Sequence, residues 1–128
     1  MRLLLDTHLL LWAAAAPERL PVAAAELIED AGNVPVFSAA SLWEVAIKAG
    51  LGRADFTADA GVLRRGLIEN GYEELPVSAA HACAVAALPL LHGDPFDRML
   101  VAQALVEGLT LVTAVPALRG YPGAVRVV

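Results

Sequence analysis

The sequence is short of the two residue types that most often carry reactive sulfur or amine chemistry: it has a single cysteine and a single lysine. One cysteine, Cys83, cannot form an internal disulfide bond, so a reducing, cytoplasmic compartment is expected. Cys83 lies in an apolar helical stretch, which predicts a buried and inert thiol. Positive charge is also scarce. The formal net charge of −5 argues against nucleic-acid binding through bulk charge, although it does not exclude an enzyme that acts on nucleic acid.

A long uninterrupted apolar run is absent as well, so no membrane span and no membrane partner are expected. The longest stretch without Asp, Glu, Lys or Arg, residues 75–93, is rich in alanine and broken by two prolines. Residues 1–17 superficially resemble a signal peptide. Asp6 and His8 interrupt their apolar run, however, so we do not expect export.

The composition predicts a folded chain with one core. The 128 residues, 58% hydrophobic and 18% charged, are enough for one domain, which we expect to span residues 1–128. Short apolar runs alternate with segments of helical periodicity, and this order predicts an α/β fold with a mostly parallel sheet covered on both faces. The expected strands are residues 2–5, 34–38, 72–77, 110–114 and 125–128, and the expected helices are residues 7–16, 21–31, 39–50, 59–70, 78–88 and 95–107.

Acidic residues at the junctions of these elements are the candidate site, because ligands bind beyond the carboxyl ends of strands in such sheets. Asp6 follows the first strand and precedes the first helix. It is either a helix cap or a functional acid, and the sequence favours neither. Thr7 is an alternative cap, which would leave Asp6 free.

Glu44 shares a helical face with Trp43 and Ile47, which is an unusual place for a solvated charge. Two structural roles compete with a functional one. Ser41 and Glu44 match the S-x-x-E capping box, and Glu44 precedes Lys48 by four residues, the spacing of a surface ion pair.

The motif DPFD opens the last long helix with two more acids. Asp94, directly before Pro95, suits an N-cap. Asp97 shares a helical face with Val101 and Ala104, so its carboxylate should lean toward the core. We therefore assign Asp94 to capping and Asp97 to ligand binding.

Asp6, Glu44 and Asp97 would repel one another if the sheet gathered them, and a divalent cation would remove that repulsion. Ligands that are all oxygen suit Mg²⁺ or Mn²⁺. Zinc would favour histidine or cysteine, and the three histidines, His8, His81 and His92, have no ligand spacing.

Three blocks of the sequence together resemble the PIN-domain proteins, specifically the VapC-type toxins of bacterial toxin–antitoxin pairs: LLLDTHLLLWA, SAASLWEVAIKAGLGR and HGDPFDRMLVAQALVEGLTLVT. The resemblance covers nearly the whole chain. It implies a three-layer α/β/α sandwich, Mg²⁺- or Mn²⁺-dependent endoribonuclease activity, a homodimer and a VapB-type antitoxin that occludes the active groove.

The resemblance also implies roles for individual residues. Asp6, Glu44 and Asp97 match the acidic metal site, Asp94 is a possible further ligand, and Thr7 and Thr113 match the hydroxyl residues beside the acids. Such proteins commonly place a fourth acid or an amide two residues after the position of Thr113. This sequence has Val115 there, which cannot ligate a metal.

Two other classes of protein remain as alternatives. A phosphoacceptor domain also has an aspartate after its first strand, but it needs a lysine late in the sheet, and the only lysine is Lys48. A module that binds its antitoxin without catalysis is the second alternative, because Val115 replaces an acid. Whatever the class, Trp12 and Trp43 lie on apolar helix faces and are expected to be core or partner-contact residues, in the antitoxin groove or a dimer contact, rather than base-stacking platforms.

Arginines are the candidates for contacts with an RNA backbone, and the sequence does not rank them: Arg53, Arg64, Arg65, Arg98 and Arg119. Replacing Asp6 or Asp97 by asparagine is expected to abolish cleavage and to preserve or raise stability in the absence of metal, because mutual repulsion is relieved.

Overall fold

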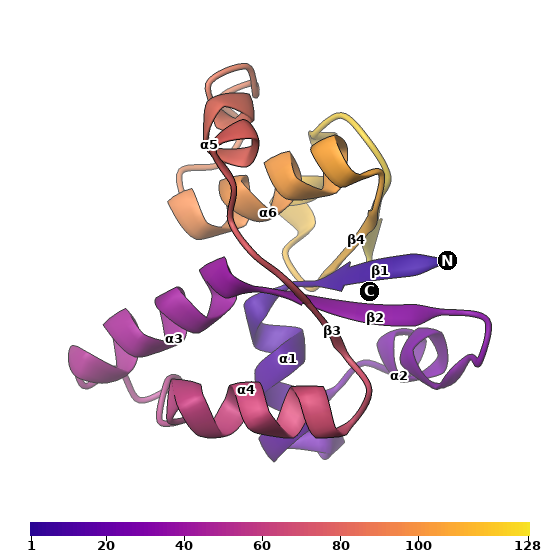
Figure 1. Ribbon diagram of the computed structural model, residues 1–128, viewed down its shortest axis with the longest axis vertical. Helices are drawn as coiled ribbons and strands as arrows, with labels where there is room; N and C mark the ends of the chain where they lie inside the picture. Colours follow the sequence, from indigo (N-terminus) through magenta and orange to yellow (C-terminus); the bar gives the residue numbers. More distant parts are fainter.

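Five parallel strands form one sheet in the order β3-β2-β1-β4-β5 (Figure 1). The computed structural model describes residues 1–128. Its strands are β1 (Arg2–Leu5), β2 (Val34–Ser38), β3 (Glu73–Leu75), β4 (Thr110–Thr113) and β5 (Val125–Val127). Its helices are α1 (Thr7–Ala15), α2 (Val22–Glu29), α3 (Ala39–Gly50), α4 (Ala60–Glu69), α5 (Ala79–Val85) and α6 (Pro95–Glu107).

Every strand and helix expected from the sequence is present, and the sheet is entirely parallel. The bounds of α3 and α6 agree with the expected ones. Two short 3-10 helices were not expected: η1 (Pro17–Arg19) and η2 (Pro116–Gly120). Each begins at a proline, whose fixed φ favours a tight turn of this kind.

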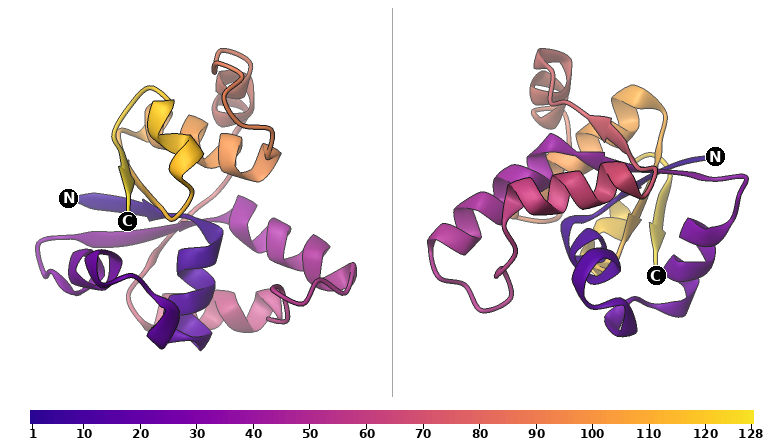
Figure 2. Two further views of the ribbon diagram at one scale, coloured as in Figure 1. Left: turned by 180° about the vertical axis from the view of Figure 1, so that it is seen from behind. Right: turned by 60° about the horizontal axis from the view of Figure 1, so that its bottom comes forward.

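The sheet is the middle layer of three, which confirms the α/β/α sandwich. Alternate side chains of β1 enter two different cores: Leu3 and Leu5 pack with α1 to α4, and Leu4 packs with α6 and η2. In Figures 1 and 2, helices α1, α2 and α4 lie on one side of the strands, and α5 and α6 lie on the other. Because both faces are covered, β1 is apolar at consecutive positions rather than at alternate ones.

The strand order reverses at β1. The chain continues from β1 to β2 on one side, and later returns to place β4 on the other side. In open parallel sheets such a switch point leaves a crevice beyond the carboxyl ends of the two diverging strands. Here those ends are followed by Asp6, after β1, and Ala114, after β4.

The expectation that Cys83 is buried is wrong, and the exposure of α3 is also informative. Cys83 is exposed, because the short helix α5 packs on α6 through His81 and leaves Cys83 on its outer side. Trp43 is 64% exposed, and Ile47 is also exposed, because α3 is rotated so that Ala40, Ser41, Glu44 and Val45 face inward. No helix of the chain combines the length and the apolar character of a membrane span.

Candidate active site

Asp6 joins three elements at the switch point. Its side chain is buried, its Oδ1 accepts a hydrogen bond from the amide of Leu9 at 2.9 Å, and its Oδ2 accepts from Thr113 Oγ1 at 2.7 Å and from the Ala114 amide at 2.9 Å. Asp6 therefore caps α1 and also links the ends of β1 and β4. The capping role that the sequence offered for Asp6 is confirmed.

Glu44 is buried in α3 and faces the first turn of α1. The hydroxyl of Thr7 donates to Glu44 Oε1 at 2.6 Å and lies 2.9 Å from Ser41 Oγ. One capping role weighed from the sequence is wrong, because Ser38 rather than Ser41 caps α3. For α1 the sequence offered Asp6 or Thr7, and Asp6 is the cap. Thr7 and Ser41 lie inside their helices, where their hydroxyls are free for a tertiary contact.

Lys48 is the second polar partner of Glu44, and the sequence did not reveal how deeply this ion pair is buried. Its Nζ lies 2.5 Å from Glu44 Oε2 and 4.0 Å from Asp94 Oδ2. The predicted i,i+4 pair is therefore present, but it is not a surface pair, since the side chain of Glu44 is 4% exposed and that of Lys48 is 16% exposed.

Asp94 and Asp97 approach this group from the start of α6. Asp94 Oδ1 accepts from the amides of Phe96 at 2.8 Å and Asp97 at 3.1 Å, which confirms its predicted role as a cap. Its other oxygen faces Lys48. Asp97 Oδ2 lies 2.9 Å from His92 Nε2. One ligand atom each from His92, Asp94 and Asp97 lie within 4.8 Å of one another.

His92 is the site residue that the sequence analysis missed. The spacing of the histidines suggested no ligand group, yet the loop before α6 turns His92 back onto Asp97. The amide of His92 donates to the hydroxyl of the buried Tyr121 at 3.0 Å, which fixes the loop from the far end of the chain. The only local signal in the sequence was that His92 stands two residues before the DPFD motif. That closeness does not by itself predict a contact between His92 and Asp97.

The pKa of Asp97 is raised, and part of the rise comes from the other acids nearby. Burial, followed by the negative charge of Asp94, raises the pKa of Asp97 to about 6, and the charges of Asp6 and Glu44 add to the rise, whereas the contact with His92 lowers it. The four acids therefore share one electrostatic environment. Asp6 and Glu44 nevertheless lie outside the close group that Asp97 forms with His92 and Asp94.

Val115, which stands where related proteins commonly have a fourth acid or an amide, makes an apolar contact instead. Thr113 is fully buried, donates to Asp6, and accepts a hydrogen bond from the Val115 amide at 3.0 Å. The side chain of Val115 packs against the apolar cluster beneath α6. The end of β4 thus contributes a hydroxyl and two backbone amides to the site, but no carboxylate.

Two of the arginines that were candidates for RNA contacts are engaged in the fold. The guanidinium of Arg98 donates to the carbonyl oxygens of Pro89 and Val85 and to the Tyr121 hydroxyl, at 2.9, 3.3 and 3.0 Å. Arg64 pairs with Glu74, and this contact lowers the pKa of the Glu74 carboxyl. Arg98 therefore helps to hold the loop that carries His92.

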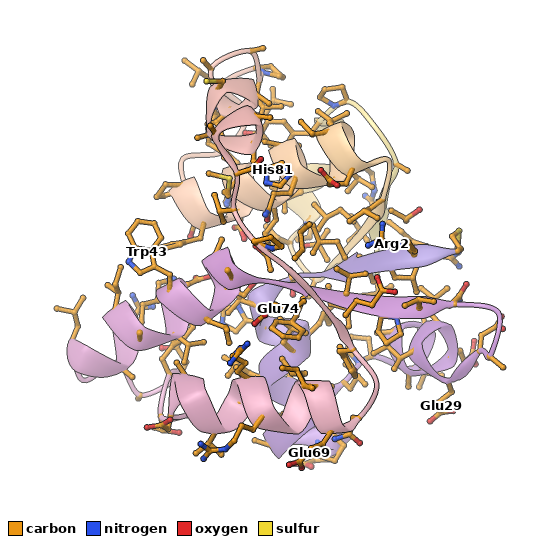
Figure 3. The ribbon with its side chains drawn as sticks, viewed as in Figure 1. Arg2, Glu29, Trp43, Glu69, Glu74 and His81 are labelled. Atoms are coloured by element: carbon orange, nitrogen blue, oxygen red, sulfur yellow. The ribbon has the colours of Figure 1, made fainter.

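An apolar groove of about 580 Å³ borders the acids. It is lined mainly by α3, α5 and α6, and Trp43 and Phe96 meet across its mouth with ring centroids 5.2 Å apart in an edge-to-face arrangement. Figure 3 shows Trp43 projecting from α3. Trp43 is thus not a core residue but part of this groove, whereas Trp12 packs at the margin of one core.

Residues 3–114 match the sequence profile of the PIN domain, and the chain belongs to this family, in its VapC-type branch. It is 34% identical over 119 residues to Ribonuclease VapC22 of Mycobacterium tuberculosis, covering 92% of this chain and 90% of that protein. The resemblance inferred from the three sequence blocks is confirmed.

Solved structures of the same fold are toxin–antitoxin complexes. VapBC2 from Rickettsia felis, bound to a DNA fragment from its promoter, matches with a TM-score of 0.72 at 18% identity, over 98% of both chains. DNA-bound VapBC from Salmonella typhimurium matches with a TM-score of 0.67 at 18% identity, over 100% of this chain and 97% of that one. At these identities the matches establish the fold.

Proposed function

We propose that this protein is the toxin of a type II toxin–antitoxin pair and that it hydrolyses RNA phosphodiester bonds as a metal-dependent endoribonuclease. The observation that carries this proposal is the gathering of acids from three elements beyond the carboxyl ends of β1 and β4. The relationship to Ribonuclease VapC22 supports the choice of RNA as substrate.

The residues present fit Mg²⁺ or Mn²⁺, because carboxylate oxygens are the ligands that both ions accept. Asp6, Glu44 and Asp97 would hold the ion, with Asp94 as a further candidate ligand. A divalent ion bound there supplies Lewis acidity and lowers the pKa of a coordinated water. Thr113 and Thr7 orient the Asp6 and Glu44 carboxylates by the hydrogen bonds described above.

The test is cleavage of a mixed RNA pool with added Mg²⁺ or Mn²⁺. We expect fragments that disappear on chelation and a rate that falls roughly 10²-fold or more in Asp97→Asn. Glu74→Gln is the matched control, because it removes one exposed acid that pairs with Arg64 on α4, and it should cleave at the normal rate. Cleavage that persists in EDTA, or in Asp97→Asn, would refute the proposal.

Val115 favours a second candidate function, a VapC-type module that binds its antitoxin but has weakened catalysis. Its amide donates to Thr113 Oγ1, which in turn donates to Asp6, so position 115 is two hydrogen bonds from a proposed ligand. We expect Val115→Asp to tighten Mn²⁺ binding about threefold or more, as measured by calorimetry.

Val115→Asn controls for that experiment, since it loses the same apolar packing without adding a charge. Equal Mn²⁺ affinities for the two variants would mean that side chains at position 115 point away from the acids. Activity gained only in Val115→Asp would favour the weakened module over the full enzyme.

We propose a VapB-type antitoxin as a protein partner, supported by the solved VapBC complexes of the same fold. We also propose a second copy of the chain as a partner, on the family resemblance alone. The groove at Trp43 supplies apolar surface for one of them. We further propose that residues 1–128 act as one domain, in the cytoplasm.

A further inference from the structure

Lys48, the only lysine of the chain, lies inside the acid cluster rather than on the surface. Its ammonium lies 2.5 Å from Glu44 Oε2 and 4.0 Å from Asp94 Oδ2, so it connects an acid of α3 to the acid that caps α6. No other lysine or arginine of the chain lies within ion-pair distance of Asp6, Glu44, Asp94 or Asp97.

The surroundings of Lys48 hold the ammonium in this place. Nζ lies 4.7 Å from the ring centroid of Phe56 and 5.6 Å from that of Phe96, where the negative faces of the rings favour a cation. Phe56 is itself buried. A lysine that had only an exposed i,i+4 partner would contribute little to stability. Removing one member of a buried pair, by contrast, leaves an uncompensated charge.

Both oxygens of Glu44 are engaged, Oε1 by Thr7 and Oε2 by Lys48. A divalent cation that used Glu44 would approach an oxygen that already has a positive partner, and two cations so close would repel each other. Lys48 and the metal therefore compensate the same negative charge.

We infer that Lys48 is the internal counter-ion of the metal-free cluster and competes with a divalent cation for Glu44, so that it lowers the metal affinity of the site. This inference rests on the proposed metal site. In the metal-free protein Lys48 stabilises the assembled acids. When a cation binds, the ammonium has to withdraw from Glu44, which reduces the net gain on binding.

The test measures Mn²⁺ affinity and metal-free thermal stability, without RNA. Lys48→Gln should lower the metal-free Tm, because Glu44 loses its charge partner, and should lower the Kd for Mn²⁺ at least threefold. Arg2→Gln is the matched control: it removes one positive charge from an exposed pair with Glu73 at the opposite end of β1, and should change the Kd less than twofold. Lys48→Arg keeps the charge and should bind Mn²⁺ within twofold of the natural protein.

The inference is overturned if Lys48→Gln binds Mn²⁺ with unchanged or weaker affinity while Asp97→Asn abolishes binding. A different result, equal Mn²⁺ binding by the natural protein and Asp97→Asn, would overturn the metal site itself and the inference with it. If Lys48→Gln does not fold without metal, refolding it with Mn²⁺ decides the question. Recovery of folding supports the counter-ion role, and failure to recover contradicts it.

Discussion

Asp97→Asn is expected to lose nuclease activity and to become more stable than the natural protein in the absence of metal. The ionised Asp97 is disfavoured in the fold, because burial and the charge of Asp94 raise its pKa to about 6. At pH 7.5 the neutral amide avoids that penalty, which is at most about 3 kcal/mol for a rise of about two pKa units. Thermal unfolding in EDTA should therefore show a higher Tm for the variant.

The stability gain of Asp97→Asn should depend on pH in a defined direction. A carboxyl whose pKa is higher in the folded state binds its proton more tightly there, so the penalty grows as pH rises from 3.8 to about 6 and is complete above that. The groups that set this balance are His92, Asp94, Asp6 and Glu44. We expect the gain at pH 5 to be about half of that at pH 7.5. A gain that does not change with pH would contradict this origin.

Asp6→Asn should also lose activity, but it should be destabilised, by about 2 to 4 kcal/mol. Asp6 accepts hydrogen bonds at both oxygens, from Leu9 and Ala114 amides and from the Thr113 hydroxyl. Asparagine has one acceptor oxygen, and its amide group would face a buried N–H donor. One backbone donor is then left without a partner, at the junction that joins β1 and β4.

Chemical denaturation in EDTA measures this effect, with Asp97→Asn as the matched substitution. Both variants exchange one carboxylate for an amide, so opposite changes in the free energy of unfolding reflect the different surroundings of the fully buried Asp6 and the partly buried Asp97. Thr113→Val should also be destabilised, since it removes one of the three donors to Asp6 and the acceptor of the Val115 amide. Equal stability of Asp6→Asn and the natural protein would show that the capping contacts contribute little.

The opposite stability changes expected for Asp97→Asn and Asp6→Asn could not be predicted from the sequence. The sequence placed both at junctions and predicted one outcome for both, preserved or raised stability, from mutual repulsion alone. At Asp97 burial and the adjacent charge of Asp94 both disfavour the ionised carboxylate, and burial is the larger cause. At Asp6 the donors from residues 113 and 114 oppose the repulsion, and a contact across 107 residues leaves no local pattern in the chain.

Local sequence patterns predicted the N-cap of α6 correctly but the N-cap of α3 wrongly. DPFD predicted the cap and the start of α6, because a proline at the first turn and an acid before it act within a few residues. The S-x-x-E pattern at Ser41 misled, since Ser38 supplied an earlier cap and α3 continued through Ser41. A pattern alone does not reveal which of two competent caps the chain uses.

Periodicity and composition by themselves determined the α/β class, the order of elements and the three acids to inspect, since strand and helix patterns act over a few residues. Only the tertiary structure decided that Lys48 and His92 join those acids, that Trp43 borders a groove, and that Val115 packs against an apolar cluster. The physical reason is that charge compensation and burial depend on which segments meet, and the reversal of strand order at β1 brings residues 6, 44, 94 and 97 into one environment.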